Sequence, residues 1–140
     1  MRRVAETVGV THRAVAQAVG GRDALLRAVA VRGYEELGHW ASGQPDRRAF
    51  AERYLRFALA EPRLYDVTMS RTDERWDDPA LRAAALAVID AARAAGCGTD
   101  DEIKRLWMIL HGGVSLHRSG GLAPRRDEEL IAFMLEMSDG

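Results

Sequence analysis

Apolar side chains recur every three or four residues through most of this chain, and no stretch alternates polar and apolar residues as a β-strand would. Residues that favour helices, above all Ala, Leu, Arg and Glu, predominate. The pattern predicts an all-α protein in which each helix turns an apolar stripe toward a shared core.

Start and stop signals divide the pattern into separate helices. Thr11, Asp78 and Thr99 are expected to cap helix starts, and Gly20-Gly21 is expected to end a helix. The segment 62–70, PRLYDVTMS, is expected to be rich in turns. The predicted helices cover residues 2–8, 12–19, 23–41, 46–60, 78–96, 99–118 and 125–138.

The stretch VAETVGVTHRAVAQAV, residues 4–19, has the spacing of a helix-turn-helix. Gly9 suits the turn, Ala5 suits the close crossing of the two helices, and Thr11 caps the second helix. The polar residues that follow this cap lie where such motifs contact bases in the major groove. A plain helical hairpin packed in a bundle has the same spacing, so the motif by itself leaves both interpretations open.

The charge is unevenly distributed along the chain. Residues 1–32 contain six arginines and two acids, whereas residues 33–140 contain 14 basic and 19 acidic residues. A basic end attached to a mildly acidic body is typical of a module that faces an anion such as DNA, although a solvated arginine-rich surface has the same composition.

Length and cysteine content narrow the class of protein. The 140 residues suffice for one core without disulfides, and no apolar run approaches the ~18 residues of a membrane span. The single cysteine, Cys97, has no partner for an internal disulfide, and no secretory leader is recognisable. We therefore expect a cytoplasmic protein that does not enter a membrane.

The stretch VAETVGVTHRAVAQAVGGRDALLRAVAVRGYEEL closely resembles the second to fourth helices of the tetracycline-repressor (TetR) family of bacterial transcription regulators. The matching features are Gly9-Val10-Thr11, Arg22 and Ala24-Leu25-Leu26. Two later stretches, YLRFALAEPRLYDVTMS and LWMILHGGVSLHRSGGL, resemble the ligand-binding portion of one branch, the WHG domain. Its Trp, His and Gly correspond to Trp107, His111 and Gly112.

The resemblance implies a homodimeric repressor that leaves operator DNA when a small, apolar effector binds. Residues 1–35 would form a partial helix-turn-helix region, and residues 36–140 the ligand-binding and dimerisation domain. Arginines would contact phosphates, and residues of the second helix would face bases. The expected DNA-binding residues are Arg2, Arg3, Thr11, His12, Arg13, Gln17 and Arg22.

Bulky side chains with an occasional polar group are candidates for the effector site, because apolar ligand sites combine these features. Aromatic and methionine side chains at helical spacing are also common in ordinary cores, so this alternative stays open. The candidates are Trp40, Tyr54, Phe57, Tyr65, Met69, Trp107, Met108 and His111.

The last two predicted helices each carry an apolar stripe, and two copies of this pair would make a four-helix bundle across a twofold axis. The residues expected in this dimer interface are Leu106, Leu110, Val114, Leu130, Phe133, Met134 and Met137.

Two departures from the family support a rival function. Met1 stands where the family's second helix begins, so the usual first helix is expected to be absent. Ala16 and Ala18 replace the Tyr and the aromatic or His that the family commonly has late in the recognition helix. The rival is a reduced dimeric module that binds a small molecule and no longer binds DNA.

No arrangement of residues indicates catalysis, a metal site or a cofactor. His111 and His117 are six residues apart and point about 120° away from each other on a helix, so they are not placed to share a metal. His111 is expected to make a buried hydrogen bond that fixes helix packing. The acids of TDERWDD and TDDE are expected to cap helix starts. We therefore expect no enzyme activity.

Overall fold

The computed structural model describes residues 12–139, with side chains from residue 20 onward, and within this range it contains helices and no strands. The all-α fold class is therefore confirmed. The elements are α2 (His12–Ala41), α3 (Arg47–Ala60), α4 (Pro62–Ser70), the short 3₁₀ helix η1 (Thr72–Trp76), α5 (Pro79–Ala94), α6 (Asp100–Arg118) and α7 (Asp127–Ser138).

Three of these helices begin at side-chain caps. The Asp46 carboxylate accepts a hydrogen bond from the backbone N–H of Ala49 at 2.8 Å. Asp78 accepts from two backbone N–H groups of α5, and Thr99 forms a capping box with Glu102 at the start of α6. The predicted caps at Asp78 and Thr99 are confirmed, and these two side chains accept hydrogen bonds from backbone N–H groups that a helix start leaves unpaired.

The predicted helix end at Gly20-Gly21 is wrong, because α2 continues through both residues. Neither glycine has a positive φ, the backbone conformation that a terminating glycine would adopt. A glycine in a helix interior costs only about 1 kcal/mol relative to alanine, and a helix of 30 residues absorbs two of them.

The expected turn-rich segment 62–70 is also wrong, because it forms α4. Pro62 ends α3 and at the same time occupies the first turn of α4, where its missing N–H is not needed. The predicted helix 2–8, the turn at Gly9 and the cap at Thr11 lie outside the described residues.

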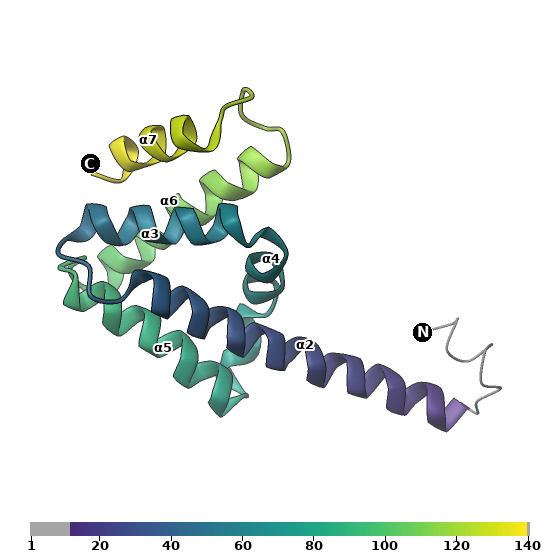
Figure 1. Cartoon of the computed structure of the whole chain (residues 1–140). Helices are drawn as coiled ribbons and strands as arrows, with labels where there is room; N and C mark the ends of the chain where they lie inside the picture. Colours follow the sequence, from purple (N-terminus) through teal and green to yellow (C-terminus); the bar gives the residue numbers. More distant parts are fainter. Residues whose placement is uncertain (1–11, 140) are drawn as a thin grey trace.

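Helix α3 lies between two other groups of helices (Figure 1). On one side α2 and α5 pack along each other, and on the other side α6 and α7 cover α3. Helix α4 crosses α2, while the N-terminal end of α2 extends beyond the other labelled helices (Figure 1).

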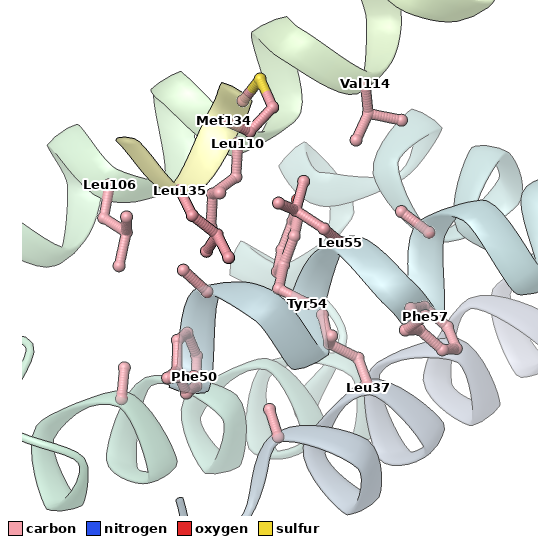
Figure 2. Packing of buried hydrophobic residues seen from close by; sticks show 14 of the residues in the cluster. Leu37, Phe50, Tyr54, Leu55, Phe57, Leu106, Leu110, Val114, Met134 and Leu135 are labelled. Carbon is pink, nitrogen blue, oxygen red and sulfur yellow. The ribbon is translucent and has the colours of Figure 1, made fainter. Parts of the chain in front are cut away.

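The main core forms between α3 and the pair α6 and α7. Leu55 of α3 and Leu106, Leu110 and Val114 of α6 are at most 1% exposed, and the α6 side chains point toward α3 (Figure 2). Met134 reaches this core next to Gly113, where an added Cβ would lie 2.1 Å from the Met134 sulfur. The fold therefore depends on α3 as the central helix.

Among residues 12–139, no helix combines the length and the apolar character needed to cross a membrane.

Candidate functional site

A cavity of about 130 Å³ lies among α2, α3, α5 and α6. Leu37, Phe50, Val88, Ile89 and Leu110 contribute to its largely apolar wall. Met69 of α4 and Arg75 of η1 also reach it. The remaining lining residues are Tyr34, Tyr54, Ala85, Ala92, Ile103, Lys104, Leu106 and Trp107.

Small side chains on α5 explain why this space is not filled. Helix α5 packs closely along α2 but makes sparse backbone contact with α6. On the wall that faces the cavity, α5 presents Ala85 and Ala92 beside the larger Val88 and Ile89, and the two methyl groups leave space unfilled. The alanines of α5 thus favour the helix and also leave space beside it for the cavity.

Polar groups gather at the part of the cavity that η1 reaches. The Arg75 guanidinium donates to the Thr72 carbonyl, lies 4.7 Å from the Trp76 ring centroid and lies 6.0 Å from that of Trp107. Burial raises the pKa of Tyr34, and the nearby positive charge of Arg75 opposes that rise. The Tyr34 hydroxyl is therefore a neutral donor near a cation.

A second polar feature is a hydrogen-bonded chain behind the cavity. The Tyr54 and Tyr65 hydroxyls are 2.6 Å apart, and the Tyr65 hydroxyl lies 2.8 Å from Nδ1 of His111. Burial raises the pKa of both tyrosines and lowers the pKa of His111. At neutral pH, Nδ1 of the neutral imidazole can therefore accept a hydrogen bond from the Tyr65 hydroxyl, which in turn can accept a hydrogen bond from the Tyr54 hydroxyl.

The expected hydrogen bond of His111 is confirmed, with Tyr65 of α4 as its partner. Tyr54 lines the cavity, Tyr65 belongs to α4 and His111 belongs to α6. The hydrogen bonds among these three side chains therefore connect one wall of the cavity to α4 and α6.

The structure brings only some of the candidate effector residues to the cavity. Tyr54, Met69 and Trp107 line it, whereas Tyr65 and His111 lie in the hydrogen-bonded chain behind Tyr54. The other three lie elsewhere: Phe57 is fully buried in the hydrophobic core, Trp40 packs edge to face against it, and Met108 is 64% exposed on α6.

Sequence reasoning missed Tyr34, Arg75 and Lys104 as lining residues. Tyr34 follows Ala30 by four residues and precedes Leu37 by three, so it has the spacing of the apolar side chains on that helix. This spacing could have identified Tyr34 from the sequence. Nothing in the local sequence distinguished Arg75, because it reaches the cavity only through the packing of η1 against α5.

The predicted dimer residues are mostly buried inside one chain. Five of them, Leu106, Leu110, Val114, Leu130 and Met134, are at most 2% exposed. The apolar face of α3 covers this part of α6 and α7, so these five side chains belong to the chain's own core. Of the other two, Phe133 is half-buried and Met137 is 53% exposed.

The predicted DNA-binding residues lie at the N-terminal end. Arg2, Arg3 and Thr11 fall outside the described residues. His12, Arg13 and Gln17 belong to the first part of α2, where the structure describes the backbone only, and Arg22 is exposed on the same helix.

Comparisons with known proteins identify the family of the helices that surround the cavity. Residues 47–138 match the family model of the tetracyclin repressor-like C-terminal domain. A search of curated proteins and a search of solved structures each gave no match. The matched region runs from the start of α3 to the end of α7 and includes most of the residues that line the cavity. Because the match covers more than half of the sequence, this chain belongs to the TetR family of regulators.

Proposed function

We propose that this chain is a transcriptional repressor whose affinity for operator DNA changes when a small molecule occupies the cavity. One observation carries the proposal: Tyr34 and Leu37 of α2 line the cavity, and α2 extends without a break to His12. A ligand that displaces this wall acts on the same helix that leads into the helix-turn-helix-like sequence.

The assignment to the WHG branch stays a prediction. Two of its three characteristic residues have distinct surroundings here, since Trp107 lines the cavity and His111 bonds to Tyr65. Gly112 lies on α6, where an added Cβ would meet nothing within 4 Å. These placements support a role for the Trp and the His in shaping the ligand site.

A second copy of the chain is expected to dock on the outer face of α6 and α7. Met108 and Leu116, which are eight residues apart on α6, are 64% and 50% exposed, and Gly112 lies midway between them. Met137 of α7 is 53% exposed. Exposed apolar side chains on the last two helices are what a two-fold helical interface would bury.

DNA binding can be measured by fluorescence anisotropy with duplexes from the region that flanks the chain's own gene. We expect binding to one fragment that weakens steeply with salt, because phosphate contacts release counterions. Arg13→Ala and Gln17→Ala should each reduce the preference for that fragment by about fivefold to a hundredfold. Arg32→Ala, a change at an exposed residue farther along α2, is the matched control.

A second function, a dimeric module that binds a small molecule without DNA, is favoured by one observation. Ala16 and Ala18 lack groups that reach phosphates. Equal, weak binding to every fragment in the same assay would overturn the repressor proposal and support this second function.

A further inference from the structure

The size of the cavity limits its ligand. At about 130 Å³ it is close to an engineered apolar cavity of about 150 Å³ that holds one benzene molecule. It is smaller than the roughly 300–1,000 Å³ of sites for drug-sized ligands. The part of a ligand that lies inside this cavity is therefore about as large as one six-membered ring.

The charged groups on the cavity wall are both cations. Arg75 and Lys104 line it, and no aspartate or glutamate does so among the described residues. Lys104 is 69% exposed, which places it where the cavity meets solvent, and its ammonium group lies 3.9 Å from an Asp101 carboxylate oxygen. An anionic group on the ligand would therefore meet positive charge without a competing acid on the wall.

Arg75 differs from several arginines that already have acidic partners. Arg71 pairs with Glu74 and Asp23, and Arg118 pairs with Asp66. Within the described part of the chain, Arg75 forms no ion pair. The Thr72 carbonyl and the rings of Trp76 and Trp107 hold its guanidinium in place. A fixed guanidinium with unused N–H donors matches the two oxygens of a carboxylate.

Tyr34 adds a neutral donor to this cation. It is 6% exposed and lines the cavity, and its hydroxyl makes no hydrogen bond to another side chain or backbone group among residues 12–139. The Tyr34 hydroxyl is not fully buried, so it can reach the cavity space and donate a hydrogen bond to a ligand oxygen near Arg75.

We propose that the cavity binds an apolar carboxylate with the bulk of a single ring, whose carboxylate pairs with Arg75 and whose body lies against Phe50, Val88 and Leu110. The inference rests on the proposed function only in taking this cavity as the effector site. It specifies the charge, the size and the anchoring residue of the effector.

Calorimetric titration of the full chain tests the charge and size of the ligand. Benzoate is the probe, benzyl alcohol and benzylamine are neutral and cationic probes of similar size, and 2-naphthoate is a two-ring acid. We expect benzoate to bind about tenfold to a hundredfold more tightly than benzyl alcohol, since hydrogen bonds to charged groups are the stronger ones. Benzylamine and 2-naphthoate should bind more weakly than benzoate.

Substitution of Arg75 tests the anchor. Arg75→Gln should weaken the binding of benzoate about tenfold or more and leave the binding of benzyl alcohol unchanged. The affinity of Arg75→Lys for benzoate should lie between that of Arg75→Gln and that of the natural chain. Arg82→Gln, at an exposed arginine of α5 that does not line the cavity, should bind benzoate normally. Circular dichroism checks that each variant is folded. If Arg75→Gln does not fold, Arg75→Lys still tests the anchor, because it retains the charge but not the two-pronged guanidinium.

The outcomes separate this inference from the proposed function. Failure of benzoate to bind, equal binding of benzoate and benzyl alcohol, or an unaffected Arg75→Gln variant would overturn the inference. Benzoate binding that depends on Arg75 but leaves the anisotropy with DNA unchanged would uphold the ligand class and overturn the effector role alone.

Discussion

At Gly33, α2 crosses α4 so closely that a methyl group has no room. A Cβ at this position would lie 1.7 Å from Oγ1 and 3.0 Å from Cβ of Thr68, which is fully buried. We expect Gly33→Ala to lower the free energy of unfolding by about 1–3 kcal/mol, since overpacking a close contact has this cost. Urea unfolding followed by circular dichroism measures the change.

Two further variants test the cause. Gly33→Ala combined with Thr68→Ala should recover part of the loss, because the second change removes the clashing hydroxyl. Gly38→Ala is the matched control on the same helix, where the added Cβ would make an ordinary 3.7 Å contact with Val88. The free energy of unfolding of Gly38→Ala should stay the same or rise by about 0.5–1 kcal/mol. A similar loss of stability at both glycines would contradict a clash with Thr68 as the cause.

His111 makes stability depend on pH. Burial lowers its pKa in the folded state below the usual 6.5, so the unfolded chain takes up a proton at a higher pH than the folded chain does. This contribution to stability is complete above about pH 6.5 and is lost as the pH falls through the lowered folded-state pKa. We expect the free energy of unfolding to be smaller at about pH 5.5 than at about pH 7.5.

The variant His111→Gln retains an acceptor for Tyr65 and removes the titration. Its free energy of unfolding should therefore change less between the two pH values than that of the natural chain. His39→Gln, at an exposed histidine of α2, controls for the loss of one histidine. The same pH dependence in the natural chain and in His111→Gln would rule out this origin.

At the scale of elements, the continuity of α2 is testable through its glycines. Gly20 and Gly21 have no atom within 4 Å of an added Cβ and no positive φ. Gly20→Ala and Gly21→Ala should therefore raise helicity, with a gain of about 0.5–1 kcal/mol for each in local helix stability. Far-UV circular dichroism and amide exchange across residues 12–22 measure the effect.

Gly96→Ala provides the contrast. An added Cβ at Gly96 also meets nothing within 4 Å, but its φ is +80°, so alanine should be destabilising by about 1–2 kcal/mol. A loss of helicity in Gly20→Ala or Gly21→Ala would mean that α2 is interrupted in solution.

The helices that the sequence predicted well are those with local signals at their ends. Asp78-Pro79 and the pair Thr99 and Glu102 place the starts of α5 and α6, because caps act within one turn. Helix α4 was missed because Pro62 indicates both the end of one helix and the start of the next. Local preference alone does not decide between these two roles.

The candidate site was less predictable because it depends on contacts between distant segments. Aromatic residues on the expected stripes included Tyr54 and Trp107, which do line the cavity. Arg75 follows Tyr54 by 21 residues, with α4 between them in the sequence, and only folding brings both side chains to one cavity. Likewise, the apolar stripe of α6 shows that a neighbour covers it but does not identify α3 as that neighbour.

At the scale of the whole molecule, the exposed face of α6 and α7 predicts the oligomeric state. We expect a dimer in analytical ultracentrifugation at micromolar concentration. Met108→Glu or Leu116→Glu should raise the dissociation constant by about a hundredfold or more, because an unpaired carboxylate would be buried. Leu86→Glu, at an apolar residue of α5 that is 48% exposed, should leave the dimer intact. A monomer in the natural chain would contradict the proposed interface.

The unbroken length of α2 converts a small movement at the cavity into a larger one at its far end. At 1.5 Å per residue, the axis from Tyr34 to His12 is about 33 Å long. If the helix pivots rigidly where its wall residues meet the ligand, a tilt of about 5° displaces the far end by about 3 Å. Two such ends in a dimer would change their separation by several ångströms, so a ligand no larger than one ring would suffice to move both out of register with a fixed pair of sites.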